Sequence, residues 1–296
     1  MTEILAIVVT YNRSEKLKAC LQSLSAQTNK AFDVLVVDNA STDGTKEYLQ
    51  TRSDLLVLSE EKNVGGAGGF YDGMRYGTEH GYKYLWLMDD DVLPQEDALE
   101  RLLVADGNLN GTYGFLSSLA LFTDGTPAVM NNHLLKSKIS TDSLTHRNGE
   151  TYVEVLSATF VSFFIKTGTV KTFGFPLKEM FLWSDDTEYS TRITKKEKGY
   201  FVPQSVVVHA MDKNEKPDLV TLSYDRLPRM VLNVRNRYYI ARRDGFKKKL
   251  RFYARHTILF FRVLCKAKDH RIKRLNVLFK GTIKGWLFRP KSQKNK

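Results

Sequence analysis

The sequence contains little cysteine and no long apolar segment. Cys20 and Cys265 are the only two cysteines among 296 residues. They provide neither a disulfide framework nor a cysteine-rich metal cluster, which favours a reducing compartment. No run reaches the roughly 18 apolar residues of a membrane-spanning helix, because Arg262 interrupts the most apolar late run, 257–265. The strand-like segment 4–9 lacks the basic lead and cleavage site of a secretory signal, so we expect none.

Acidic residues are scarce in the last part of the chain. Residues 226–296 hold 23 of the 45 basic residues and only two acids, a formal charge of +21. Residues 1–225 hold 22 basic residues and 31 acids, a formal charge of −9. The net charge of +12 therefore hides an acidic body and a strongly basic tail. With 42% hydrophobic residues the chain can bury a sizeable core, which excludes wholesale disorder.

Strand-like and helix-like segments alternate in the first part of the body. The pattern predicts strands at 4–9, 34–37, 55–58 and 84–88, and helices that begin at Ser14, at Ser41 or Thr42, at Phe70 and at Pro94. Four alternations in about 100 residues indicate right-handed βαβ units on a parallel sheet. Ligands of such sheets bind beyond the carboxyl ends of the strands. Later β-prone runs suggest further strands that close the site.

Three aspartates, Asp89, Asp90 and Asp91, end one of these strands. Side chains alternate along a strand, so Asp89 and Asp91 should face one side and Asp90 the other. Two carboxylates on one side suit a hard divalent cation that also contacts substrate phosphates. His209, at the end of another apolar run, is a candidate third ligand. The plainer interpretations are an acidic turn before the next helix and a structural histidine.

Two further segments carry candidate site residues. Residues 63–70 hold four glycines before an expected helix, where backbone can approach an anion closely, although a flexible turn explains them equally well. Another helix begins with Trp183, Asp185, Asp186 and Glu188. Asp185 and Glu188 have the spacing of a capping box. Asp186 is not needed for that cap and is a candidate general base toward an acceptor hydroxyl.

Taken in order, these segments resemble the inverting family 2 glycosyltransferases of GT-A fold. Segments 8–13, 37–44 and 89–91 carry the resemblance, while 63–70 and 183–188 look like those of bacterial galactofuranosyltransferases and, next, rhamnosyltransferases. It implies an α/β fold: a Rossmann-like, mainly parallel sheet flanked by helices, with a catalytic domain at 1–225 and a basic α-helical extension at 226–296. Ser184, between the tryptophan and the aspartate pair, departs from the galactofuranosyltransferase pattern.

The resemblance also implies roles for single residues. Asp186 would be the catalytic base, while Asp185 and Glu188 would orient sugar hydroxyls. Mn²⁺ or Mg²⁺ on the donor diphosphate would be bound by Asp89, Asp91 and His209. The nucleotide-sugar donor, with a UDP-sugar favoured, would lie among Thr10, Tyr11, Asn12, Arg13, Asp38, Asn63, Gly66, Gly68, Gly69, Asp90 and Trp183.

The implied activity is an inverting, metal-dependent transfer of galactofuranose from UDP-galactofuranose to a hydroxyl of a lipid-linked cell-surface glycan. The chain is shorter than polymerising members of the group, which favours the addition of one or a few residues. Two alternatives stay open. One is a rhamnosyltransferase that uses dTDP-rhamnose, and the other is a non-catalytic protein that binds sugar nucleotides or acts as a membrane scaffold.

The basic tail contains two amphipathic segments. Apolar residues recur every three or four positions along 246–264 and again along 272–286, with basic residues on the opposite face. Such helices commonly lie in the membrane interface, where each Lys or Arg near anionic lipid contributes about 1 kcal/mol. We therefore expect a peripheral protein at the cytoplasmic face of an anionic membrane. Alternatively, the apolar faces pack on the body or on a second subunit; nucleic-acid binding is disfavoured because no recognised module is present.

Overall fold

The computed structural model describes residues 2–131, 133–135 and 144–291. Its strands are β1 (Ile4–Thr10), β2 (Phe32–Asp38), β3 (Leu56–Ser59), β4 (Tyr84–Asp89), β5 (Val92–Pro94), β6 (Phe115–Leu121), β7 (Leu134–Leu135), β8 (Leu144–Arg147), β9 (Glu150–Ser157), β10 (Phe163–Lys166) and β11 (Gly199–His209). Its helices are α1 (Ser14–Ser25), α2 (Thr45–Gln50), α3 (Gly65–Glu79), α4 (Ala98–Asn108), α5 (Thr167–Phe173), α6 (Asp185–Ile193), α7 (Leu227–Arg243), α8 (Phe246–Lys266) and α9 (Arg271–Leu287), with short 3-10 turns η1 (Val129–Asn131), η3 (Lys178–Met180) and η4 (Tyr224–Arg226).

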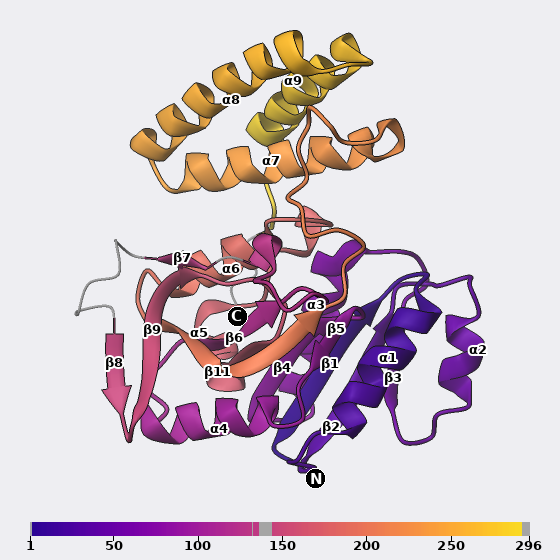
Figure 1. The fold of residues 1–296 in the computed structure, drawn as a ribbon, viewed down its shortest axis with the longest axis vertical. Helices are drawn as coiled ribbons and strands as arrows, with labels where there is room; N and C mark the ends of the chain where they lie inside the picture. The colour runs from indigo at the N-terminus through magenta and orange to yellow at the C-terminus, as the bar shows by residue number, and fades with distance from the viewer. Residues whose placement is uncertain (1, 132, 136–143, 292–296) are drawn as a thin grey trace.

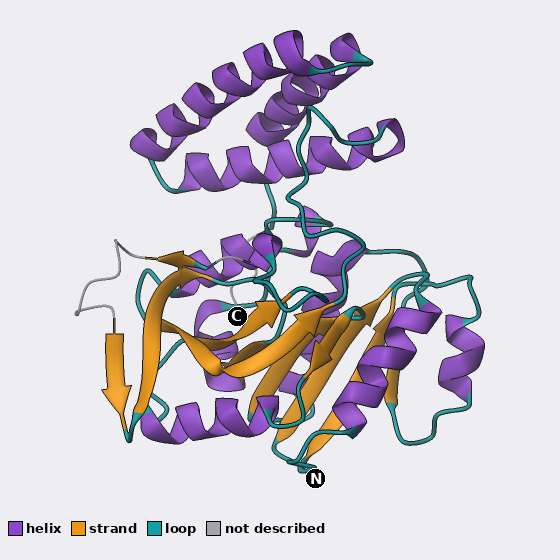
Figure 2. Cartoon of the chain, in the orientation of Figure 1, coloured by secondary structure: helices purple, strands orange, loops and turns teal. Residues whose placement is uncertain are grey.

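The described strands form one mixed sheet, which Figure 2 shows with helices on both faces. The strand order is β3-β2-β1-β4-β10-β6-β11-β9-β7, with β5 paired to β11 and β8 to β9. Strands β3, β2, β1 and β4 are parallel, as the alternation in the sequence predicts. Strand β10 runs antiparallel between β4 and β6. The predicted α/β architecture with a mainly parallel N-terminal half is confirmed.

Each face of the sheet carries its own apolar core. Ala6 and Val8 of β1 point into the core beneath α1 and α4. Leu5 and Ile7, the alternate residues of the same strand, point into the core beneath α3, α5 and α6. Because β1 is buried on both faces, it is apolar throughout rather than alternating. Each fully buried large side chain contributes about 1.5–3 kcal/mol to stability, so β1 anchors both helical layers.

The glycine-rich segment 63–69 is not the loop that we predicted. Helix α3 already begins at Gly65. Gly69, Gly73 and Gly77 repeat every four residues and lie on one face of α3; a Cβ on any of them would approach a side chain of β1 or β4 to 2.5–2.6 Å. The glycines therefore let α3 lie directly on the sheet. The prediction was wrong because it treated glycine as a turn signal and missed the helical spacing.

Two other local expectations are corrected. Pro94 does not open a helix but ends β5, where it pairs with Val207 of β11, and α4 begins only at Ala98. The helix expected at Ser41 or Thr42 begins later, with α2. The residues before α2 instead form hydrogen bonds to the loop that follows β1, and this holds the ends of two strands together.

Helices α7, α8 and α9, here called the helical module, form a separate layer beyond the carboxyl edge of the sheet (Figure 1). The two predicted amphipathic segments are α8 and α9, and α7 lies between them and the body. Helices α9 and α7 pack closely, because a Cβ on Gly281 would lie 2.5 Å from Val234 and one on Gly285 would lie 2.9 Å from the Arg235 carbonyl. No helix in the described residues is both long and apolar enough to cross a membrane.

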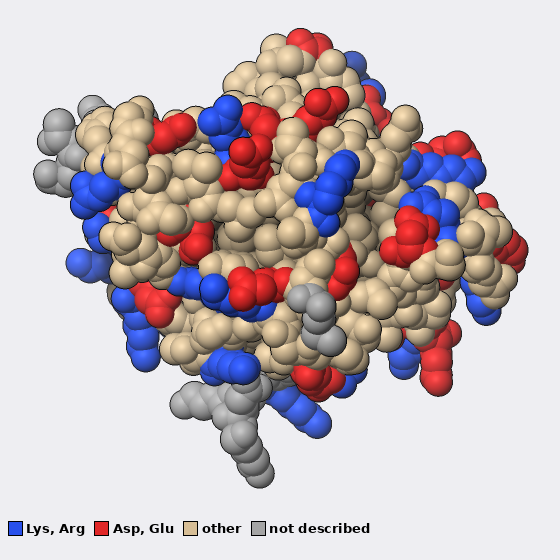
Figure 3. Space-filling model, turned by 90° about the horizontal axis from the view of Figure 1, so that it is seen from below, with Lys and Arg blue, Asp and Glu red and all other residues tan. Residues whose placement is uncertain are grey.

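Charge is distributed differently on the two parts. The underside of the body, away from the helical module, carries acidic and basic side chains interspersed (Figure 3). Within the helical module and its connections, Asp244 and Asp269 are the two acids of the basic tail. Both are paired: Asp244 contacts Lys195 and Arg243, and Asp269 contacts Arg274. The remaining basic side chains of this part give it a strongly positive field.

Candidate active site

Four strands bring predicted site residues to one edge of the sheet. Thr10 ends β1, Asp38 ends β2, Asp89 ends β4 and His209 ends β11. Strands β1, β2 and β4 are parallel. Strand β11 runs parallel to β6, and both β6 and β4 are antiparallel to β10. All four strands therefore end at the same edge, as the rule for parallel sheets predicts.

Asp89, Asp91 and His209 converge at this edge. Each offers one ligand atom, and these atoms lie within 4.8 Å of one another. His209 Nε2 is 3.1 Å from Asp91 Oδ1. The other ring nitrogen, Nδ1, lies 2.8 Å from Asn131 Oδ1, and Asn131 is itself held by a hydrogen bond to Thr159 Oγ1 at 2.9 Å. Asn131 therefore fixes the orientation of the imidazole ring.

The donor set of this group fits a divalent cation. Asn131 Oδ1 accepts the Nδ1 proton, so in the neutral form of the His209 ring the Nε2 lone pair would face Asp91 Oδ1. That oxygen is buried and accepts no well-aligned hydrogen bond within the described residues. Two lone pairs that face each other repel, and a shared cation or a second proton on the ring removes this repulsion. Carboxylate and imidazole ligands with one such outer partner are typical of Mn²⁺ and Mg²⁺ sites of enzymes.

Asp90 faces different partners from its two neighbours, as the alternation along the strand predicts. Its Oδ2 accepts a hydrogen bond from Thr10 Oγ1 at 2.8 Å. Arg13 Nη1 lies 3.2 Å from Asp90 Oδ1 and 3.0 Å from Asp91 Oδ2. Arg13 thus does not extend freely into a base pocket but offsets the charge of the aspartate run. Its side chain remains about half exposed, at 48%, so part of it stays accessible.

The three aspartates have different proton affinities. Burial, and then the charges of Asp91 and Asp90, raise the pKa of Asp89 well above its usual range. Burial also raises the pKa of Asp90, against the opposing effect of Arg13. For Asp91, burial is outweighed by contact with His209 and by the charge of Arg13, so its pKa is lowered. Asp91 is the carboxylate that stays ionised most readily.

The residues predicted to surround the nucleotide join the ends of β1 and β2. Asn12 Oδ1 accepts a hydrogen bond from the Thr42 N–H at 2.7 Å. Asp38 is buried, and its Oδ1 accepts from the Ser41 N–H at 3.1 Å. Tyr11 is exposed between them, at 42%. The three lie together at the carboxyl edge, and their roles toward a nucleotide stay predictions.

The acid pair Asp185–Asp186 opens helix α6. Burial raises the pKa of both carboxyls, and the charge of Asp186 raises that of Asp185 further. Asp186 Oδ1 accepts from the Thr187 N–H at 2.5 Å. The pair lies near the aspartate run, since the charge of Asp185 also contributes to the raised pKa of Asp89. A carboxyl whose pKa is moved toward neutrality suits proton transfer.

Glu188 has a different environment from the one expected. It is buried, with Arg192 Nη2 3.0 Å from Oε2 and Arg243 against Oε1. Both oxygens are thus taken by arginines, and these contacts do not support a role in orienting sugar hydroxyls. The capping-box interpretation is also wrong, because Ser184 is the N-cap residue and no side chain caps the helix.

The glycine-rich segment 63–69 contacts the residues that lead into the acid pair Asp185–Asp186. Asn63 Oδ1 accepts from the Gly65 N–H at 2.7 Å, and a Cβ on Gly65 would lie 2.0 Å from the Phe181 carbonyl oxygen. Gly68 faces Val64, and Gly69 faces β1, so packing accounts for both. By contrast, a Cβ on Gly66 would meet open space. Trp183, the other predicted donor contact, is half-buried against the apolar core of the helical module.

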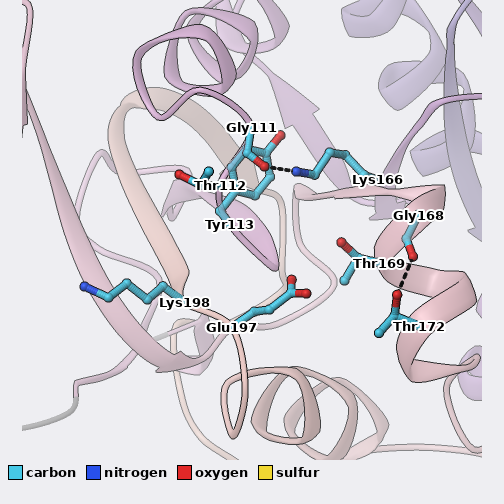
Figure 4. Close-up of a pocket in the computed structure, with 9 residues that line it drawn as sticks. All are labelled: Gly111, Thr112, Tyr113, Lys166, Gly168, Thr169, Thr172, Glu197 and Lys198. Atoms are coloured by element: carbon cyan, nitrogen blue, oxygen red, sulfur yellow. Dashed lines mark hydrogen bonds between the residues drawn. The ribbon is translucent and has the colours of Figure 1, made fainter.

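A separate hollow of about 510 Å³ lies at the opposite edge of the sheet. Figure 4 shows Lys166 reaching the Gly111 carbonyl across it, with Tyr113 and Glu197 on its walls. These residues precede β6 and β11 or end the antiparallel β10, so the hollow is at the amino edge. None of the predicted site residues lines it.

Comparisons with known proteins identify the enzyme class of this chain. Residues 5–108 match the model of glycosyl transferase family 2. Galactofuranosyltransferase GlfT1 of Mycobacterium tuberculosis is 25% identical over 262 residues, which are 84% of this chain and 86% of that protein. An undecaprenyl-phosphate mannosyltransferase of Micrococcus luteus is 40% identical over 106 residues, 34% of this chain and 43% of that protein. The chain is a glycosyltransferase. The alternative of a non-catalytic scaffold is thereby set aside.

The fold of the glycosyltransferase is also confirmed. The mannosyltransferase PcManGT from Pyrobaculum calidifontis, solved in complex with GDP-Man and Mn²⁺, resembles it with a TM-score of 0.57. The sequence identity is 17%, over 96% of this chain and 87% of that one. At this identity the likeness shows the fold alone, which is the predicted GT-A fold.

The structure adds residues that the sequence did not single out. Asn131 orients His209 from η1, more than 70 residues away along the chain. Helix α7 contributes three more side chains. Arg235 donates to the Glu179 carbonyl, Asn236 donates to the Trp183 carbonyl, and Arg243 pairs with Glu188. Nothing in the sequence indicated what the side chains of Arg235 and Asn236 contact.

We predict that Asn131→Ala weakens Mn²⁺ binding by about 10–100-fold, the usual effect of losing an outer partner of a histidine ligand. The measurement is isothermal titration of the purified full chain with Mn²⁺. Asn108→Ala is the matched control, because Asn108 bonds to Tyr152 Oη at the far end of α4. Equal Mn²⁺ affinity in the two variants would contradict the assigned role of Asn131.

Proposed function

We propose that this glycosyltransferase transfers galactofuranose from UDP-galactofuranose to a hydroxyl of a lipid-linked glycan, with inversion at the anomeric carbon and with a bound divalent cation. The proximity of two acidic groups carries the proposal. One, Asp89 and Asp91 with His209, has a cation-binding donor set. The other, Asp185 and Asp186, is close enough for Asp185 to raise the pKa of Asp89.

The residues divide the chemistry between them. A Mn²⁺ or Mg²⁺ held by Asp89, Asp91 and His209 would offset charge on the leaving nucleoside diphosphate. Asp186 takes the proton from the acceptor hydroxyl as that oxygen attacks the anomeric carbon. Attack from the face opposite the leaving group is a single displacement, which inverts the configuration. Burial of Asp186 makes its carboxylate a stronger base than an exposed aspartate.

The relatives support galactofuranose over other sugars. GlfT1, a galactofuranosyltransferase, aligns along 84% of this chain. The bacterial mannosyltransferase aligns over about a third of the chain only. A rhamnosyltransferase that uses dTDP-rhamnose is the second candidate within the same chemistry.

A donor screen tests the proposal. We expect UDP-galactofuranose with Mn²⁺ to raise the melting temperature of the full chain more than dTDP-rhamnose or GDP-mannose does, because a ligand that binds the native state stabilises it. UDP release in the presence of octyl β-galactofuranoside, a mimic of a lipid-linked sugar, should stop with EDTA and return with Mn²⁺ or Mg²⁺. A larger shift with dTDP-rhamnose would favour the second candidate, and turnover in EDTA would contradict the metal assignment.

The base assignment has its own test. We predict that Asp186→Asn lowers kcat at least about 100-fold and leaves the affinity for UDP-galactofuranose unchanged. In the unmodified enzyme Asp186 must be ionised to accept a proton, and its pKa is raised. Activity should therefore fall with decreasing pH well above the range near 3.9 where an exposed aspartate titrates. Full activity of the variant would refute the assignment.

We also propose that the helical module docks on an anionic membrane at the cytoplasmic face. The predicted apolar stripes of α8 and α9 do not pack on the body but are exposed. They comprise Phe246, Leu250, Tyr253, Phe260, Phe261, Leu264, Ile272, Phe279, Ile283, Trp286 and Leu287.

The packing of α9 shows why its stripe is free. Its buried face is formed by Arg274, Val277, Leu278, Gly281 and Gly285. The two glycines lie against α7, and Arg274 donates to backbone carbonyls of Leu219 and Leu222. Ile272, Phe279 and Trp286 lie outside this face and are 84%, 68% and 60% exposed. Exposed aromatic and aliphatic residues beside many basic ones match an interfacial helix on anionic lipid. An interface with a second subunit is the alternative occupant.

Flotation distinguishes these occupants. We expect the full chain to float with vesicles that contain phosphatidylglycerol and not with vesicles of phosphatidylcholine alone. Phe279→Ser combined with Trp286→Ser should abolish flotation by removing apolar area. Val104→Ser, at an exposed apolar residue of α4 on the body, is the control. If the chain does not float, and the double variant converts a dimer into a monomer, the stripes form a subunit interface.

A further inference from the structure

The segment that leads into the acid pair has an unfavourable backbone conformation. Phe181, Trp183 and Ser184 have φ values of 62°, 65° and 68°. This is the left-handed region, which side chains with a Cβ rarely adopt. Such a conformation persists only where neighbouring structure holds it. Asp185 follows directly, so whatever holds residues 181–184 also sets where the acid pair points.

Helix α7 of the helical module supplies the main support. Asn236 is completely buried. Its Nδ2 donates to the carbonyl oxygens of Met180, Leu182 and Trp183 at 3.0, 3.1 and 2.8 Å. These carbonyls lie within or beside the left-handed residues. The two protons of the Asn236 amide are shared among the three acceptors, so one side chain binds three points of the segment.

Arg235 fixes the orientation of that amide. Its Nε donates to Asn236 Oδ1 at 2.9 Å, so Nδ2 must face the carbonyls. Its Nη2 donates to the carbonyl oxygens of Glu179 and Met180 at 2.9 and 2.8 Å. The two neighbouring side chains thus bind a continuous stretch of backbone from η3 to the start of α6.

The other sides of the segment are also fixed. Two turns further along α7, Arg243 contacts Glu188 within α6. On the opposite flank, the Ala67 N–H of α3 donates to the Phe181 carbonyl oxygen at 3.2 Å. Contacts from α7 and α3 therefore hold the backbone that precedes the acid pair. A further contact from α7, through Arg243, holds the helix that follows it.

We propose that Asn236 is a positioning residue for the acid pair, and that the helical module is thus part of the active site as well as a surface for docking. This inference rests on the proposed role of Asp186 as the base. No hydrogen bond joins Asn236 to the strand-end residues predicted to hold the nucleotide, within the described residues. Loss of Asn236 should therefore impair the chemical step and spare donor binding.

The test compares two variants of the same helix. Asn236→Ala removes the amide, whereas Asn233→Ala makes the same substitution one turn earlier, at a half-buried residue that forms no hydrogen bond to 179–184 in the described structure. The measurements on the full chain are the affinity for UDP-galactofuranose with Mn²⁺, and kcat from UDP release with octyl β-galactofuranoside. We expect Asn236→Ala to lower kcat about 100-fold, since small misplacements of catalytic groups have such effects. Its donor affinity should stay within about threefold of the unmodified enzyme, and Asn233→Ala should match that enzyme.

A purely structural role gives a different result. In that case Asn236→Ala lowers the melting temperature, but kcat per donor-binding site is unchanged, and the inference is overturned. If Asn236→Ala does not fold, Arg235→Gln decides, because it leaves the amide in place and removes the bond that orients it. A fall in kcat at constant donor affinity is then expected, and an unchanged kcat overturns the inference. Full activity of Asp186→Asn would refute the proposed role of Asp186 as the base, and with it this inference. If Asp186→Asn is inactive while the Asn236 and Arg235 variants are fully active, the role of Asp186 stands and only this inference is overturned.

Discussion

The cost of burying several carboxylates close together governs this protein. Burial raises the pKa of Asp89, Asp90, Asp185 and Asp186, and for Asp91 the same effect is outweighed by its contacts. Like charges in a poorly solvated site repel unless cations or protons offset them. The chain offsets part of the charge with basic side chains, and the proposed metal ion and acceptor proton would offset the rest.

The same constraint links the body to the helical module. Glu188 is buried beside the acid pair, and its charge is offset by one arginine from α6 and another, Arg243, from α7. The basic tail is therefore not only a surface for anionic partners. One of its arginines completes an ion-pair cluster of the body, while the exposed apolar stripes of α8 and α9 point away from it. The proposed docking surface and the proposed base are therefore connected through α7.

Local patterns predicted much of the fold and failed at identifiable residues. The βαβ alternation, the ends of β1, β2, β4 and β11, and helices α8 and α9 follow from periodicity, which depends on near neighbours only. The glycines at 65–69 were misread as a loop, because a glycine run signals a turn unless its contacts with the sheet are known. Pro94 was misread because its strand forms only by pairing with β11, more than a hundred residues later.

The sequence by itself determined the parallel sheet, the grouping of Asp89 and Asp91 with the end of β11, and the division into an acidic body and a basic tail. These follow from strand alternation, the common edge of parallel strands and a count of charges. Only the tertiary structure decided that Asn131 orients His209, that Arg243 pairs with Glu188, and that Asn236 donates to the backbone before Asp185. Each of these contacts joins residues about 50 or more positions apart, and the hydrogen bond of a buried polar group is set by whatever partner the folded chain brings to it.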